Sequence, residues 1–315
     1  MSLLAYAARR LLWTVPLLVG VLLATYALLR GSGGSPFRPP EGYIGVPETY
    51  ERLLRRHYHL DEPWLVEFAY WLENVFTLEF GPSLVLRELD VAAIVRDSLP
   101  VTLELVALSA AWAVPAGIAL GVWGATSRSR LADLLATATA TLLLVVPVFF
   151  VAFALRQYAF ADWGLVPLGW DGWRSKVLPV LALGLPPVGY VARLIRVAMA
   201  EALQEDYVRT AVAMGLRRWR IVWVHALRNA LAPVVAAGIP MVALLVTGAF
   251  FVERAFAVPG VSAFFVEAAR TRDYPIVMNL TAALAVVVLA ANLVSDVLLA
   301  LVDPRVRDQV GREGS

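Results

Sequence analysis

Long apolar segments separated by polar ones dominate the pattern along this chain of 315 residues. A window of about 19 residues finds runs that are long enough to cross the roughly 30 Å hydrocarbon core of a bilayer. These runs are Leu11 to Leu29, Leu99 to Trp123, Leu131 to Tyr158, Val177 to Val197, Ala230 to Phe251, and Ile276 to Val302. The pattern therefore predicts an all-α integral membrane protein with six transmembrane helices.

Composition agrees with this interpretation. The chain is 60% hydrophobic and 17% charged, whereas soluble domains are about 45–50% apolar and about 25% charged. The net charge is only +2 and the basic residues are scattered, so we expect no nucleic-acid partner. The absence of cysteine excludes disulfides, thiolate metal sites and cysteine nucleophiles.

The long polar segment from Arg30 to Ser98 follows the first apolar run. It opens with the breaker GSGGSPFRPPEG. Pro63 then begins a helical pattern that places Trp64, Phe68 and Trp71 on one face. Such an aromatic stripe fits a helix lying on the membrane surface, and it fits equally well a helix that packs against the ends of the spanning helices.

Arginines predict the orientation. Outside the long first loop, they gather in the segments that share a side with the N-terminus, while the two short loops on the other side hold fewer. Because basic residues favour the cytoplasmic side, we expect both termini to be cytoplasmic and the long loop to lie outside.

A charged segment, EALQEDYVRTAVAMGLRRWRIVWVHALRNALAPVV, lies between the fourth and fifth apolar runs, on the predicted cytoplasmic side. It predicts two short helices. The first runs from Glu201 to Met214, with Tyr207, Ala211 and Met214 on one face, and Gly215 provides the permissive position after it. The second begins at Leu216 and carries Ile221, Val224 and Leu227. Amphipathic helices fixed at both ends to spanning helices suit docking to a soluble partner.

The same segment resembles the EAA motif of ABC-transporter permeases. The matching positions are Glu201, Ala202, Asp206, Tyr207, Val208, Arg209, Ala211, Gly215, Ile221, Asn229 and Pro233. Four further motifs, SLPVTLEL, ERAFAVPGV, RDYP and DPRVR, follow the order found in the first permease subunit of the dipeptide, oligopeptide and nickel family. The resemblance covers nearly the whole chain. It departs at Leu203, where the motif has alanine, and in a shortened lead before GPS at Gly81.

The resemblance implies a non-catalytic permease subunit of an ATP-driven importer of peptides. Its partners would be a second homologous permease, two ATP-binding subunits that carry ATP and Mg, and an extracytoplasmic binding protein, in a bacterial or archaeal inner membrane. Residues 1–98 would form the first helix and outside loop, 99–307 the permease domain with coupling segment 199–229, and 308–315 a cytoplasmic tail. The coupling residues would be Glu201, Ala202, Asp206, Tyr207, Arg209, Ala211 and Gly215.

Other functions have less support in the residues. No G-x-x-x-x-G-K-[ST], H-E-x-x-H or G-x-S-x-G motif occurs, so this chain shows no P-loop, zinc-protease site or hydrolase nucleophile. His57 and His59 are a weak metal candidate and are more typical of solvated surface. Import of nickel or another small solute, and a channel or enzyme outside the ABC class, stay open as alternatives.

Two polar residues interrupt the sixth apolar run. Asn292 and Asp296 are four residues apart, which places them on one face of a helix. An unpaired charge in lipid is costly, so this face must meet protein or water. The pair is interpreted either as a structural tie between helices or as part of the lining of an inner gate.

Overall fold

The computed structural model of the chain describes residues 3–31, 37, 47–85, 89–158, 164 and 167–302, apart from the side chains at 3–11, 238–240, 296 and 298–302. Within these residues the chain is helical, with one isolated bridge between Pro82 and Asp90 and no strand. It divides into two compact units. Unit 1 is formed mainly by residues 104–258, and unit 2 by residues 9–103 and 259–289.

Four single helices are long and apolar enough to cross a membrane: α1 (Leu3–Gly31), α4 (Val91–Thr126), α7 (Trp173–Ala202) and α14 (Tyr274–Val302). Two bent pairs bring the number of candidate spans to six if each pair is one span. The first pair is α5 (Arg130–Val145) with α6 (Val148–Leu155), and the second bends by 60° between Arg218–Ala236 and Met241–Phe256. For the residues that the structure describes, the all-helical fold with four to six candidate membrane spans is confirmed, whereas a bundle of six uninterrupted helices is not.

The break between α5 and α6 departs from the continuous third span predicted from Leu131 to Tyr158. The two helices meet at 90°. Val146 is extended (φ −68°, ψ 121°) and Pro147 precedes the first residue of α6. The proline ring disfavours helical backbone at the residue before it, so the helix ends there and restarts in a new direction.

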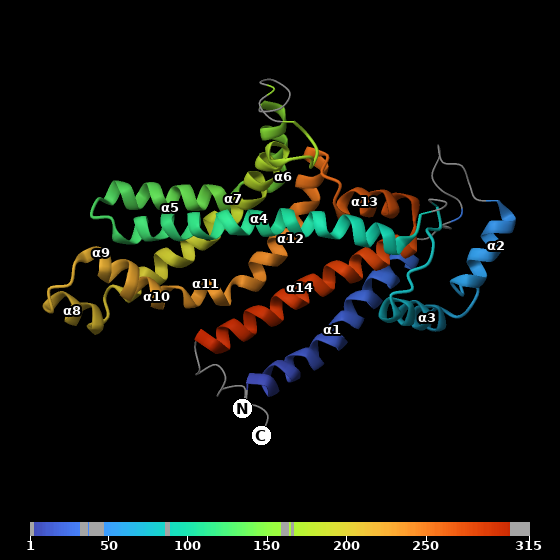
Figure 1. Ribbon diagram of the computed structural model, residues 1–315, viewed down its shortest axis with the longest axis horizontal. Coiled ribbons are helices and arrows are strands. Elements are labelled where there is room, and N and C mark those ends of the chain that lie inside the picture. The colour runs from blue at the N-terminus through green and yellow to red at the C-terminus, as the bar shows by residue number, and fades with distance from the viewer. Residues whose placement is uncertain are drawn as a thin grey trace. The chain divides into compact units, whose positions relative to one another are not determined.

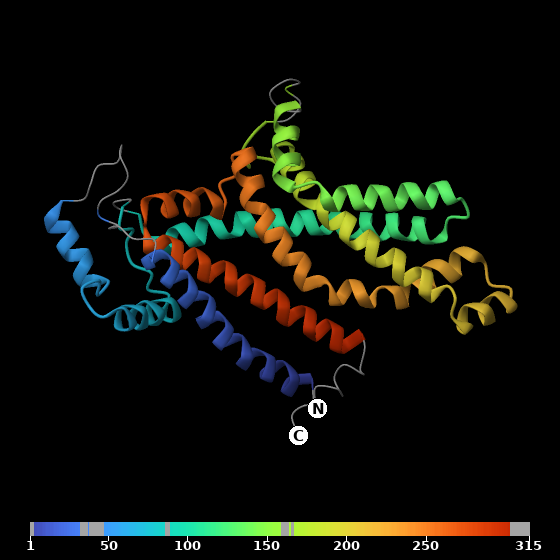
Figure 2. The same ribbon diagram turned by 180° about the vertical axis from the view of Figure 1, so that it is seen from behind.

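Close helix contacts hold unit 1 together. In Figures 1 and 2, α7 passes along both α4 and α5. A Cβ at Gly121 of α4 would lie 2.6 Å from the Ala192 carbonyl oxygen of α7, and one at Gly189 of α7 would lie 2.4 Å from the Ala140 carbonyl oxygen of α5. Glycine at these positions therefore lets the helix backbones approach closely, as is common between helices in membranes.

Polar contacts add specificity between α4 and α7. Ser109 Oγ and Trp112 Nε1 both donate to the carbonyl oxygen of Val180, at 3.2 and 3.0 Å. The indole has room because residue 184 is glycine, where a Cβ would lie 2.4 Å from Trp112 Nε1. Although α7 contains Pro179, it continues as one helix to Ala202.

In unit 2, helix α3 (Trp64–Thr77) packs on α1 and α14. Phe68 is buried and Trp71 partly buried in a cluster with Leu22, Tyr26 and Met278. The first residue of the predicted aromatic stripe, Trp64, stays 47% exposed. Packing against the spanning helices, one of the two interpretations of the stripe, is thus observed for Phe68 and Trp71.

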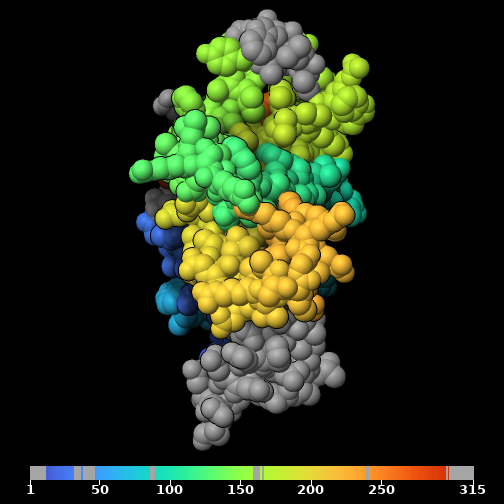
Figure 3. Space-filling view, turned by 90° about the vertical axis from the view of Figure 1, so that its left-hand side faces the viewer, coloured from blue at the N-terminus to red at the C-terminus, as the bar shows by residue number. Residues whose placement is uncertain are grey.

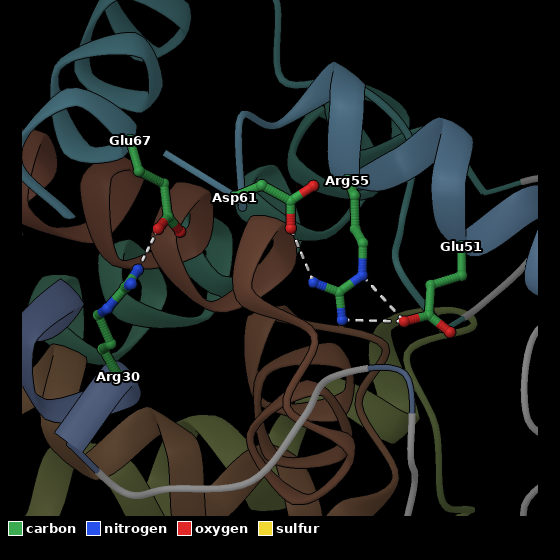
Figure 4. Close-up of polar contacts among 5 residues, drawn as sticks. All are labelled: Arg30, Glu51, Arg55, Asp61 and Glu67. Atoms are coloured by element: carbon green, nitrogen blue, oxygen red, sulfur yellow. Dashed lines mark hydrogen bonds and ion pairs between the residues drawn. The ribbon is translucent and has the colours of Figure 1, made fainter. Parts of the chain in front are cut away.

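Ion pairs support the same region (Figure 4). Arg30, near the end of α1, pairs with Glu67 of α3, whose side chain is buried. Arg55 of α2 (Glu48–His57) bonds to Glu51 and Asp61 at 2.9 and 3.1 Å, and its hydrogen bond to Glu51 raises its pKa. These contacts order the connection between α2 and α3.

Asp273 is the most deeply buried carboxylate among the described residues of unit 2. It lies between α13 (Val261–Thr271) and α14 and is fully buried. Ser83 Oγ donates to it, and the backbone N–H groups of Leu84 and Val85 approach it at 3.3 Å. The carboxylate thus ties the 81–85 segment to the start of α14.

Candidate functional site

The charged segment after α7 folds into several short pieces. Glu201 and Ala202 belong to the last turn of α7, the chain breaks its helix at 203–205, and α8 runs from Asp206 to Ala213. The first predicted helix, Glu201 to Met214, is therefore wrong as a single element. The Leu203 and Gln204 amides bond to Met199 and Glu201 carbonyls in tight turns that close α7.

The end of α8 follows the prediction for Gly215. The glycine has φ +76°, and nothing lies within 4 Å of the position of a Cβ. Its N–H bonds to the Val212 carbonyl, and the Leu216 N–H bonds to the Ala211 carbonyl, as in a Schellman motif. Leu216 also packs against Ala211, which completes the apolar contact of that motif. Backbone conformation, not crowding, requires glycine here.

The apolar residues of α8 divide between two faces. Val208 and Ala211 are buried against Ile221 of the following π-helix, η2 (Ile221–Ala226). Ala211, which the sequence placed on one face with Tyr207 and among the expected coupling residues, is not accessible to a partner, because its side chain is 4% exposed within this chain. The outward side chains are Tyr207, Val212 and Met214, exposed by 36%, 61% and 69%.

Figure 3 shows this end of unit 1, with the surface of α8 and the segment after it in yellow to light orange. A hollow of about 300 Å³ lies here, lined by Leu203, Val208, Val212, Leu216 and residues of η2. The combination of an apolar hollow and protruding apolar side chains outside the candidate spans is typical of an interaction surface.

The charged residues predicted to rim this surface are accessible. Glu201 is exposed at the end of α7, and Asp206 pairs with Arg209 at 3.3 Å with side chains 94% and 77% exposed. An exposed pair of this kind adds little to stability. Both charges therefore remain available to a partner.

Contacts connect this surface to the membrane helices of unit 1. Arg218 of α9 (Arg218–Arg220) donates to the Thr126 carbonyl at the end of α4, at 2.8 Å. Val222 and Ala226 of η2 share one apolar cluster with Met199 of α7 and with residues of α4, α10 (Leu227–Ala230) and α11 (Ala232–Ala236). These contacts join the segment that contains η2 to α4 and α7.

Sequence reasoning missed several of these features. The π-helix has no pattern that separates it from an α-helix. Trp219 of α9 and Trp223 of the π-helix are 60% and 49% exposed. Exposed tryptophans beside arginines are frequent anchors in interfaces, so the run RRWRIVW was an available signal. The bidentate bond from Arg196 of α7 to Asp133 of α5, at 2.7 and 2.9 Å, had no sequence signal.

The remaining candidates are placed less fully. Asn292 is half-buried in α14, while the side chain of Asp296 lies outside the described residues, so the role of this pair stays a prediction. His59 stacks on Tyr70 with ring centroids 3.8 Å apart. Among the described residues there is no group of three metal-binding side chains, and His57 and His59 are not part of one.

Comparisons with known proteins match this architecture. The family described as "Binding-protein-dependent transport system inner membrane component" matches residues 113–308. The chain is 36% identical to the dipeptide transport system permease protein DppB of Bacillus subtilis, over 90% of this chain and 91% of that protein.

Two further relatives cover almost the whole chain. They are the oligopeptide transport system permease protein OppB of Haemophilus influenzae, at 32% identity, and DppB of Lactococcus lactis, at 31%, each over 96% of this chain and 99% of the relative. The helices, the matched region and these relatives together show that this chain is a multi-pass membrane protein that belongs to the family of binding-protein-dependent transport system inner membrane components.

Proposed function

We propose that this chain is a permease subunit of an ATP-driven importer of di- or oligopeptides. The observation that carries the proposal is the family match together with the peptide-transport names of relatives that span the whole chain. Nickel import, the alternative within the same family, is disfavoured because these relatives are named for peptides. A channel or enzyme outside the family is not proposed further.

The segment 199–229 is the proposed docking site for an ATP-binding subunit. Tyr207, Val212 and Met214 supply protruding apolar contacts, and Glu201, Asp206 and Arg209 supply charges around them. Gly215 holds the turn that presents α8. Ala202 and Ala211 support the site from inside, because both are buried.

The complete importer would contain further subunits. A second homologous permease would complete the pathway, two ATP-binding subunits would hold ATP and Mg, and an extracytoplasmic binding protein would deliver the peptide. This chain would itself be non-catalytic and bind no cofactor. Both termini and α8 would face the cytoplasm, in agreement with the positive-inside pattern of its arginines. Residues 1–98, 99–307 and 308–315 would be its first helix with the outside loop, its permease domain and its tail.

The contacts of unit 1 suggest how movement would reach the pathway. Closure of the ATP-binding subunits would move α8 and η2, which are joined to α4 by Arg218 and to α7 by the cluster around Met199. Arg196 would carry the same movement from α7 to α5 through Asp133. Three helices would then tilt together and change access to the peptide.

A docking test uses one charge on the outward face of α8. Val212→Asp introduces a carboxylate at a side chain that is 61% exposed, so the chain folds normally while apolar docking is lost. The control Leu53→Asp makes the same change at a residue of α2 that is also 61% exposed. Co-purification of the ATP-binding subunits with the tagged chain should fail for Val212→Asp and persist for Leu53→Asp.

Retention of these subunits by Val212→Asp would exclude α8 as the docking site. Uptake of labelled di- and tripeptides by cells with and without this chain tests the substrate class separately. Uptake of nickel in place of peptides would refute the peptide proposal while leaving the docking result intact.

A further inference from the structure

A hollow of about 410 Å³, lined by both polar and apolar residues, lies among α4, α5 and α7, within unit 1. Its polar lining comes from Thr137, Thr141, Arg193 and Arg196. Small residues, Gly121 and Ala192 among them, leave the space open. Charged groups on membrane-spanning helices are costly and commonly mark a functional site. The docking surface does not include this hollow, and the proposed movement uses only the bond between Arg196 and Asp133, so Arg193 has no assigned role.

The hollow has more hydrogen-bond donor groups than acceptor groups around it. Arg196 uses Nε and one terminal nitrogen for Asp133, which leaves its other terminal nitrogen free to donate. Arg193 is exposed and has no ion-pair partner among the described residues. Asp133 therefore balances the charge of Arg196, and Arg193 adds one positive charge that no ion pair among the described residues balances.

Thr137 gives a second, independent observation. Its hydroxyl oxygen is buried and has no hydrogen-bond partner in the described part of the chain. Threonines in other helices, such as Thr126 and Thr281, donate to the carbonyl oxygen four residues earlier, at 2.8 and 2.7 Å. A buried hydroxyl without a partner costs free energy. Thr137 lines the hollow, so a rotation of its side chain toward a bound ligand with acceptor oxygens would complete its bonding.

The position of the hollow indicates the class of ligand. Arg196 is about 9 Å before the end of α7, and Thr137 is about 10 Å after the start of α5, at 1.5 Å per residue. The outer side of α5 beside them carries Leu134, Leu142 and other large apolar residues, exposed by 62% in both named cases. An anion held here would have a surface suited to acyl chains next to it.

We propose that the hollow among α4, α5 and α7 binds the phosphate of an anionic phospholipid headgroup. Arg193 and the free nitrogen of Arg196 would donate to the phosphate oxygens, and Thr137 would donate its hydroxyl proton. The acyl chains would lie along the apolar side of α5. Basic pockets between spanning helices bind anionic headgroups by this chemistry in other membrane proteins.

The test measures lipids retained by the full-length chain in its assembled complex. The protein is placed in phosphatidylcholine nanodiscs with a small fraction of phosphatidylglycerol, and native mass spectrometry reports which lipids remain bound. Arg193→Gln should reduce retention of phosphatidylglycerol by about tenfold, because a charge-assisted bond is lost. Thr137→Val, which keeps the side-chain shape, should reduce it by about fivefold.

Two controls separate this site from general attraction to surface charge. Arg128→Gln removes an exposed arginine in the nearby turn that does not line the hollow, and it should leave retention unchanged. Arg193→Lys keeps the charge and should retain more phosphatidylglycerol than Arg193→Gln. Equal retention by wild type and Arg193→Gln, or an equal loss in Arg128→Gln, would overturn the proposal.

Inorganic phosphate distinguishes a lipid headgroup from a free anion. Phosphate added at millimolar concentration should leave the retained phosphatidylglycerol in place, since the acyl chains contribute to lipid binding. Displacement by phosphate would assign the hollow to a soluble anion instead. If the wild-type complex retains no phosphatidylglycerol, another occupant, such as a partner permease or the peptide, covers the hollow and the proposal is wrong.

Discussion

Replacing Asp273 by alanine should open the 81–91 segment of unit 2. The carboxylate accepts from Ser83 Oγ and from the Leu84 and Val85 amides, and the side chains of Ser83 and Asp273 are fully buried. Without it, the Leu84 N–H loses its acceptor, and the Ser83 hydroxyl and the Ile276 N–H each lose the bond that they make to this carboxylate. The Val85 N–H keeps Ser83 Oγ as a partner at 3.2 Å.

The expected size follows from these lost bonds. A buried donor left without an acceptor costs about 1–3 kcal/mol, so we expect the loss of these bonds to cost about 3 kcal/mol in total. Since 1.4 kcal/mol corresponds to a factor of ten, the equilibrium constant for local opening should rise by about 100-fold.

Hydrogen exchange at amides that do not bond to Asp273 measures this opening. The Ser83 N–H bonds to the Leu89 carbonyl at 3.0 Å and the Val91 N–H to the Gly81 carbonyl at 3.2 Å, so both report on the segment itself. Ser83→Ala removes one side-chain partner of Asp273 and should speed exchange by only about fivefold. Unchanged exchange in Asp273→Ala, or a larger effect in Ser83→Ala, would refute the assigned role.

Three further predictions follow from the structure. Burial raises the pKa of Asp273. Its contribution to stability is therefore fully present below the ordinary carboxyl pKa and decreases as the pH rises through the raised value. Hydrogen-exchange protection of the 81–91 amides should fall over that pH range in the wild-type protein and stay level in Asp273→Asn. Gly215→Val should reduce peptide uptake without reducing the amount of chain in the membrane, because φ +76° strains a β-branched residue by about 1–3 kcal/mol. Gly215→Asn should retain uptake, because asparagine tolerates this backbone conformation. Equal uptake by both variants would contradict this reason. Cysteines at Ser129 and Ala213 should react with reagents only from the cytoplasm and one at Thr49 only from outside, and reversed labelling at two of these positions would contradict the proposed orientation.

The sequence by itself determined the class of the protein. A run of about 20 apolar residues in lipid can form all its backbone hydrogen bonds within itself only as a helix. Hydropathy alone therefore indicated membrane helices. Local chemistry also located the end of α8 at Gly215, because a left-handed residue after a helix favours glycine. The order of motifs such as ERAFAVPGV and RDYP indicated the family.

Tertiary structure decided which side chains face outward. Periodicity grouped Tyr207 with Ala211, but the chain turns back at Gly215 and η2 covers Ala211 while Tyr207 stays exposed. The 90° bend at Pro147 was not predicted, because hydropathy shows which residues are apolar but not the direction that a helix takes after a break.

Long-range pairs were equally beyond the sequence. Arg196 with Asp133 and Asp273 with Ser83 join residues 63 and 190 positions apart. Nothing in the local pattern specifies such a partner, because each contact exists only after the helices have packed. For the same physical reason, the hollow beside Arg193 and the unpartnered hydroxyl of Thr137 could be found only in the folded chain.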